Sequence, residues 1–200
     1  MTVGFSLLVS AVPSELADLY SCPPPGWHTR CTGVGAIMAS VVTARLLMML
    51  KPSKVLFIGT CGSYNLHYPL VGSFLRASCA VSASLDVLED RAYRLDSEPF
   101  KWSATLSLPV SFPALSVAVP PGITRTCFGA KLLSSIAEVE HLELTGVFAA
   151  CHEANIPCGA ILAVANQVGP EAHAQWLANH MLVSSNLVDT LKSNNIFNIL

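Results

Sequence analysis

Charged side chains are scarce in this chain of 200 residues. Aspartate, glutamate, lysine and arginine together make up 12% of it, and hydrophobic residues make up 52%. Soluble proteins average roughly 25% charged residues, so a large core, and a subunit interface in addition, are expected. The formal net charge is −2 and no basic run is present. Nucleic-acid binding through phosphate neutralisation is therefore not expected.

Long uninterrupted apolar runs are also missing. The longest apolar stretch, residues 34–50, contains Ser40, Thr43 and Arg45. A membrane-spanning helix needs about 20 nearly uninterrupted apolar residues, so this stretch predicts a buried helix, and no membrane association is expected. The apolar residues 3–12 lack the basic start of a secretory signal, which favours a cytoplasmic protein.

Paired cysteine motifs are missing as well. The seven cysteines are scattered, and no two have CxxC spacing. An odd, unpatterned set favours reduced thiols over disulfides or zinc. Cys151 and His152 with Cys158 could be imagined as a metal site, but no second ligand pair accompanies them. We therefore expect no metal.

The elements that are present alternate between strands and helices. Apolar runs predict strands at residues 3–10, 55–58, 74–82, 115–119 and 158–165, and helices at residues 13–19, 36–50, 143–155 and 171–192. Residues 86–113 show no regular pattern, and Pro99, Pro109 and Pro113 interrupt them. Strands that are apolar on both faces are typical of an α/β protein with helices on both sides of its sheet. Without a repeat or a long linker, residues 1–200 are expected to form one domain.

Four polar residues follow strands or begin helices on one expected edge of the sheet. Glu15 follows the first strand, and Thr60 lies in an expected glycine-rich turn, residues 59–63. Glu143 begins a helix, and Asn166 ends the most apolar strand. Ligands of such sheets bind beyond the carboxyl ends of the strands. Each residue alone also fits a structural role, as a helix cap or a partner of the helix dipole.

Six segments, in this order, resemble the nucleosidase/phosphorylase superfamily, and futalosine hydrolases are the most similar group within it. They are residues 10–16 (SAVPSEL), 32–35 (TGVG), 57–62 (FIGTCG), 71–72 (VG), 141–157 (HLE, then CH and IP) and 165–170 (ANQVGP) with Trp176 beyond. The resemblance implies a three-layer domain with a central mixed sheet, a homodimer, and N-ribosyl hydrolase activity without a cofactor.

The resemblance also implies roles for individual residues. Glu15 falls where the family carries the glutamate that deprotonates the attacking water, and Glu143 where it carries the glutamate that holds the ribose hydroxyls. Leu142 replaces a methionine beneath the sugar. Thr60 falls where a hydroxyl contacts the base or the nucleophile. Asn166 falls where adenine-specific nucleosidases carry the aspartate that protonates N7.

Asn166 is the most informative departure from that pattern. A 6-oxopurine presents acceptors at O6 and N7, which suit the two N–H donors of an amide and not an ionised aspartate. The expected reaction is therefore hydrolysis of futalosine to hypoxanthine. Release of adenine from methylthioadenosine or S-adenosylhomocysteine is the alternative, and a non-catalytic nucleoside-binding protein is a second.

Water is favoured over phosphate as the nucleophile. Bacterial phosphorylases of the superfamily carry an arginine near the position of Gly72, whereas Arg76 here lies within a strand. The carboxylate of Glu15 would also repel phosphate.

Four further residues are candidates for the site. Gly62 and Phe128 are candidates to contact the base or the water. Arg125 could meet a substrate carboxylate, and Trp176 could close the pocket. His141 is interpreted as structural.

Overall fold

The computed structural model describes residues 4–97 and 100–200, so Val3 and Pro99 lie outside the described residues. Its strands are β1 (Ser6–Ser10), β2 (Trp27–Cys31), β3 (Val55–Ser63), β4 (Phe74–Ser82), β5 (Lys101–Ser103), β6 (Ala114–Val119), β7 (Val139–Glu140) and β8 (Cys158–Gln167). Its helices are α1 (Pro13–Leu16), the 3-10 helix η1 (Ala17–Tyr20), α2 (Ala36–Leu50), α3 (Leu85–Leu88), α4 (Cys127–Leu133), α5 (Leu144–Glu153), α6 (Ala172–Ser193) and α7 (Ile196–Ile199).

The strands form one mixed sheet, as the resemblance implied. β1 pairs in parallel with β2 and β3, and β3 pairs in parallel with β8. β4 runs antiparallel to β8 and parallel to β6, and β7 joins β6 to β3. The strands β3, β8, β4, β6 and β7 therefore close into a ring, and the sheet is more curved than a flat central layer.

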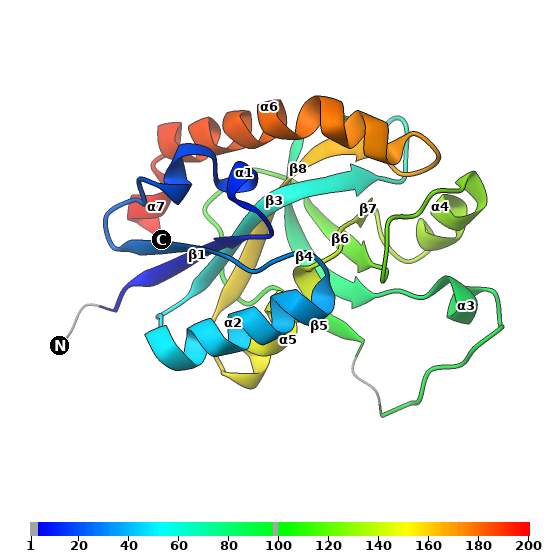
Figure 1. Ribbon diagram of the computed structural model, residues 1–200, viewed down its shortest axis with the longest axis horizontal. Helices are drawn as coiled ribbons and strands as arrows, with labels where there is room; N and C mark the ends of the chain where they lie inside the picture. Colours follow the sequence, from blue (N-terminus) through cyan, green and yellow to red (C-terminus); the bar gives the residue numbers. More distant parts are fainter. Residues whose placement is uncertain (1–3, 98–99) are drawn as a thin grey trace.

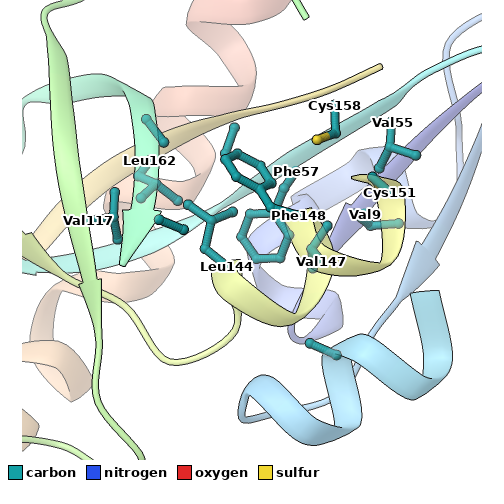
Figure 2. Close-up of a cluster of buried hydrophobic side chains, with 14 of the residues drawn as sticks. Val9, Val55, Phe57, Val117, Leu144, Val147, Phe148, Cys151, Cys158 and Leu162 are labelled. Atoms are coloured by element: carbon teal, nitrogen blue, oxygen red, sulfur yellow. The ribbon is translucent and has the colours of Figure 1, made fainter. Parts of the chain in front are cut away.

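Helices cover both faces of this sheet (Figure 1). Successive strand residues point to opposite faces. Leu7 and Phe57 accordingly belong to a core beneath α2 and α5, and Leu8 and Ile58 to a core beneath α6 and α7. Figure 2 shows the first core, in which Phe148 of α5 lies among strand side chains. Apolar residues on both strand faces thus produce the expected α/β layering.

The contact between α2 and α5 depends on a glycine. A Cβ atom on Gly146 would lie 2.0 Å from the carbonyl oxygen of Ala36 and 2.8 Å from the amide nitrogen of Ser40. Both are backbone atoms of the α2 segment, so neither can swing away. Gly146 therefore permits the close approach of the two helices, and α5 begins beside the start of α2.

Several expectations for local structure are confirmed and others are wrong. The helix at residues 36–50 and the strand at residues 74–82 have the expected bounds. The glycine-rich turn at residues 59–63 is wrong, because β3 continues to Ser63 through pairing with β8 and has a register shift between Cys61 and Gly62. The sequence shows no regular pattern over residues 86–113, whereas the structure places part of α3 and all of β5 there. The elements β2, β7 and α4 were not expected either. Among the described residues, no helix is long and apolar enough to cross a membrane.

Candidate active site

A pocket of about 270 Å³ opens at the carboxyl ends of β1, β3 and β8. These three strands run parallel, so their ends meet at one edge of the sheet. The pocket is lined by residues from seven separated segments: Ala11, Val12, Glu15, Val34, Thr60, Cys61, Gly62, Ile123, Glu140, His141, Leu142, Glu143, Asn166, Ala172, His173 and Trp176. The four polar residues expected at one sheet edge are therefore brought into one pocket.

Glu15 is the most firmly held carboxylate of the pocket. It lies in the first turn of α1, which begins at Pro13, and its side chain is buried. Its Oε1 accepts hydrogen bonds from the backbone N–H of Thr60 (2.8 Å) and from the Thr60 hydroxyl (2.7 Å). Its Oε2 accepts one from the Ala11 N–H (3.2 Å). A Cβ atom on residue 59 would lie 3.2–3.3 Å from the two carboxylate oxygens of Glu15, so the glycine at this position avoids a tight contact with the carboxylate.

Burial raises the pKa of the Glu15 carboxyl, and the hydrogen bonds from Thr60 oppose that rise. The pKa of the Glu143 carboxyl is likewise raised by burial, against the hydrogen bond from Gly35. Carboxyl groups with perturbed pKa values inside a cleft are typical of functional sites. A carboxylate with a raised pKa is also the stronger base for taking a proton from water.

Glu143 caps the start of α5 and reaches across to α2. Its Oε1 accepts a hydrogen bond from the backbone N–H of Gly35 (2.8 Å), and its Oε2 lies 3.3 Å from Nδ1 of His141. That Nδ1 also accepts a hydrogen bond from the backbone N–H of Glu143 (3.1 Å). Burial lowers the pKa of His141 to about 4, so the imidazole is neutral at pH 7. His141, interpreted from the sequence as structural, therefore lies in the pocket as a neutral ring beside Glu143.

Asn166 lies at the end of β8, directly opposite Gly62 of β3 in the strand register. Its Nδ2 donates a hydrogen bond to the backbone oxygen of Gln167 (3.0 Å). A Cβ on Gly62 would lie 2.8 Å from that nitrogen and 2.8 Å from Cγ2 of Val168. The absence of a side chain at Gly62 thus makes room for the Asn166 amide. One amide N–H and Oδ1 remain available to a ligand.

Glu140 is a pocket carboxylate that the sequence reasoning missed. It lies on β7, where its Oε2 accepts the Tyr64 hydroxyl (3.0 Å) and its Oε1 the Thr124 N–H (3.0 Å). It therefore connects the loop after β3 to the loop that carries Ile123 into the pocket. A two-residue strand gives almost no periodic signal, so only the scarcity of charge could have drawn attention to Glu140.

The remaining predicted site residues divide into two groups. Leu142, Gly62 and Trp176 line the pocket. Phe128 does not, because α4 directs it outward and leaves it 63% exposed. Arg125 is also exposed and outside the lining, although Ile123 in the same loop reaches the pocket. Neither Phe128 nor Arg125 therefore lines the pocket.

Charge in the pocket is of one sign. Three glutamates line it, and no lysine or arginine does so within residues 4–97 and 100–200. In the same part of the chain, no group of three histidine, cysteine or acidic side chains could hold a metal ion. The arrangement offers buried bases, an amide donor and apolar walls, which suit a neutral ligand with hydroxyl groups.

Comparison with known proteins identifies one family model and a set of solved structures that resemble this chain. The family model of the phosphorylase superfamily matches residues 30–114, which confirms the resemblance seen in the sequence. No protein of curated function matches the chain by sequence.

Solved structures share the fold from end to end. A 5'-methylthioadenosine/S-adenosylhomocysteine nucleosidase from Helicobacter pylori superposes with a TM-score of 0.85 at 14% identity, covering 100% of both chains. A futalosine hydrolase mutant from the same organism gives 0.85 at 16% identity, covering 99% of this chain and 100% of its own. A nucleosidase from Neisseria meningitidis in complex with methylthio-immucillin-A gives 0.81 at 13% identity, covering 96% and 100%.

Proposed function

We propose that this protein hydrolyses the N-glycosidic bond of a purine nucleoside, with futalosine as the leading substrate and hypoxanthine as the released base. The observation that carries the proposal is the meeting of Glu15, Glu143 and Asn166 in one pocket. The three residues come from distant segments, and both carboxylates are buried and hydrogen-bonded.

The proposed step assigns one task to each residue. The bond from the anomeric carbon to the base breaks with its electron pair going to the base, and positive charge develops on the ribose. Water bonds to the anomeric carbon and gives a proton to Glu15, a general-base role typically worth about 10²–10⁴-fold. Glu143 holds the ribose hydroxyls, and Asn166 hydrogen-bonds the departing base. An amide has no transferable proton, so the base takes its proton from solvent.

Water rather than phosphate is the proposed nucleophile. Phosphate sites are usually built from arginine or lysine side chains. The described part of the chain places neither in the pocket, and three glutamates would repel the anion. We therefore expect base release to be independent of phosphate.

The hydrogen bond from Asn166 to Gln167 refines the argument about the base. One N–H is already used, so the amide offers one donor and one acceptor rather than two donors. A 6-oxopurine that leaves protonated at N7 presents the complementary pair, an acceptor at O6 and a donor at N7. Adenine presents a donor at N6 and an acceptor at N7, which the same amide can also match.

Adenine release from methylthioadenosine or S-adenosylhomocysteine is therefore the second candidate function. For methylthioadenosine, whose sugar substituent is uncharged, it is favoured by the lining itself: among the described residues no lysine or arginine lines the pocket to meet a substrate carboxylate, and Val34, Ile123 and Ala172 are apolar. Arg125, the candidate partner of such a carboxylate, lies outside the lining. An uncharged substituent on the sugar fits these walls.

The deciding experiment measures free base by chromatography. Purified protein is incubated without phosphate with futalosine, inosine, methylthioadenosine and S-adenosylhomocysteine. Hypoxanthine from futalosine supports the leading proposal, and adenine from the other nucleosides supports the second candidate. No base from any nucleoside, with or without phosphate, contradicts both and leaves a non-catalytic nucleoside-binding protein.

Glu15→Gln separates catalysis from binding. The amide keeps the size of the side chain but cannot take a proton from water, so turnover should fall at least 10²-fold. Calorimetry should still detect nucleoside binding. Wild-type turnover in this variant would exclude Glu15 as the base.

Asn166→Asp tests the recognition of the base. An ionised carboxylate offers no donor to O6, so cleavage of 6-oxopurine nucleosides should weaken relative to adenine nucleosides. An unchanged ratio of the two kcat/KM values would refute the role of Asn166 in base selection.

We further propose that two copies associate through the exposed face of α2. Ile37 (81% exposed), Val41 (60%) and Met48 (73%) lie on one side of this helix. Val34, also exposed, continues that apolar face into the pocket lining, so a second copy seated there would border the pocket mouth. Exposed apolar patches of this kind mark interaction sites.

Sedimentation of Val41→Asp tests this association. The charge should convert a dimer into a monomer, whereas Tyr93→Asp, which alters an exposed aromatic residue elsewhere, should leave the dimer intact. A wild-type protein that sediments as a monomer at micromolar concentration would contradict the proposal.

A further inference from the structure

A chain of hydrogen bonds leads from the long helix α6 to Glu15. Nε1 of Trp176 donates to the Thr60 hydroxyl (3.0 Å), and that hydroxyl donates to Oε1 of Glu15 (2.7 Å). These three residues come from α6, β3 and α1, which are far apart in the sequence. The chain connects the outer helix layer to the carboxylate that the proposed function uses as a base.

The direction of this chain is fixed by its first member. An indole N–H can only donate a hydrogen bond, whereas a threonine hydroxyl has one proton and can rotate. Because Trp176 occupies an acceptor position of the Thr60 oxygen, the Thr60 proton is left to point toward Glu15. Without the indole donor, the same hydroxyl is free to turn away from the carboxylate.

The two oxygens of Glu15 are consequently unequal. Oε1 accepts two hydrogen bonds from Thr60, at 2.7 and 2.8 Å. Oε2 accepts a single longer one, 3.2 Å from the N–H of Ala11. The lone pairs of Oε2 are therefore the ones left available to receive a proton from water.

Two imidazole rings stack on the indole ring of Trp176 and restrict its orientation. The His180 ring lies parallel to the Trp176 ring at 4.0 Å with an interplanar angle of 8°, and the His173 ring at 6.1 Å with an angle of 12°. All three side chains project from α6.

We propose that Trp176 is a positioning residue, whose indole N–H orients the Thr60 hydroxyl toward Oε1 of Glu15 and thereby leaves Oε2 as the oxygen that takes the proton from water. This inference rests on the proposed role of Glu15 as the base. It assigns Trp176, which lines the pocket, an effect on the carboxylate that passes through the Thr60 hydroxyl.

Trp176→Phe removes the N–H and keeps an aromatic ring. We expect kcat to fall about tenfold, equivalent to about 1.4 kcal/mol, with KM changed less than about twofold. Loss of an oriented donor destabilises the ionised carboxylate and raises the pKa of Glu15. Since the reaction needs ionised Glu15, the acid limb of the kcat/KM profile should move to higher pH.

Trp27→Phe is the matched control. Trp27 is a buried tryptophan whose Nε1 donates to the backbone oxygen of Phe197 (2.8 Å), outside the pocket lining. This variant loses the same kind of hydrogen bond, so its stability should fall while its pH profile stays that of the wild type. An equal shift of the acid limb in both variants would reduce the role of Trp176 to general stability.

A double-mutant cycle with Thr60 tests the order of the chain. Thr60→Val removes the hydroxyl, whereas Thr60→Ser keeps it and should therefore be more active than Thr60→Val. Because Trp176 acts through Thr60, adding Trp176→Phe to Thr60→Val should cause no further loss. Independent, multiplying losses would overturn the proposal.

Carbon-13 labelling of the glutamate carboxyls gives a readout that needs no turnover. NMR titration should show a higher pKa for Glu15 in Trp176→Phe than in the wild type and in Trp27→Phe. An unchanged pKa would overturn the inference even if the nucleosidase proposal holds. A raised pKa in a protein that cleaves no nucleoside would uphold the positioning role and refute the proposed function.

Discussion

The close contact of α2 and α5 makes Gly146→Ala a demanding test of the structure. The added methyl group would meet the carbonyl oxygen of Ala36 at 2.0 Å, where ordinary contacts begin near 3.4 Å. The helices must therefore separate by roughly 1 Å or more, because the obstructing atoms belong to the backbone. Overpacking of this kind costs about 1–3 kcal/mol.

Part of that cost is offset by the backbone. Replacing a glycine in a helix interior with alanine returns up to about 1 kcal/mol. We expect a net loss of about 1–2 kcal/mol in the free energy of unfolding, from these two opposing effects. In a domain of this size that corresponds to a fall in Tm of about 2–4 °C for each kcal/mol.

The same displacement should reach the pocket. Gly35 lies at the start of α2 and donates its N–H to Oε1 of Glu143 at 2.8 Å. Separating α2 from α5 lengthens this hydrogen bond and loosens the carboxylate proposed to hold the ribose. KM for the nucleoside should therefore rise as stability falls.

Denaturant unfolding and steady-state kinetics check both effects. Gly122→Ala is the control, since a Cβ there meets nothing within 4 Å, and its stability should change by no more than about 0.5 kcal/mol. If Gly146→Ala is as stable as Gly122→Ala, the contact between α2 and α5 is not as close as described and the reasoning fails.

Three further predictions concern the pocket. Gly62→Ala should lower kcat/KM about 10²-fold in a steady-state assay, because the new methyl group displaces the Asn166 amide; full activity would contradict the pairing of these residues. His141→Asn should flatten the pH dependence of stability measured by denaturant unfolding. In the wild type the pKa of His141 in the folded state is lowered to about 4, so the free energy of unfolding falls by up to about 1.4 kcal/mol per pH unit as the pH falls from 6.5 toward 4. An unchanged slope in the variant would mean that His141 is not buried. Phe128→Ala should leave KM within about twofold, since this side chain lies outside the pocket lining, and a large rise would place it at the ligand.

Local sequence determined the regular elements and the edge at which the site lies. The helix at residues 36–50 and the strand at residues 74–82 follow from local patterns and from the break at Pro52, and their bounds are those of the structure. Glu15 follows the apolar strand β1, Asn166 lies at the end of the apolar strand β8, and the carboxyl ends of parallel strands meet. Fold class and the meeting of the polar residues were therefore accessible from the sequence.

The tertiary structure alone decided which neighbours each polar group has. Short strands such as β7 are stabilised by pairing with distant strands, which leaves no periodic pattern to read, and so Glu140 was missed. No local sequence pattern indicates the ring of strands or the contact of Trp176 with Thr60, because both join residues far apart in the chain. Nor does any pattern indicate the hydrogen bond that uses one N–H of Asn166. Loop conformation likewise brings Ile123 to the pocket and leaves Arg125 in solvent. Residue types and their order fix what chemistry is available, whereas side-chain direction depends on packing between elements far apart in the chain.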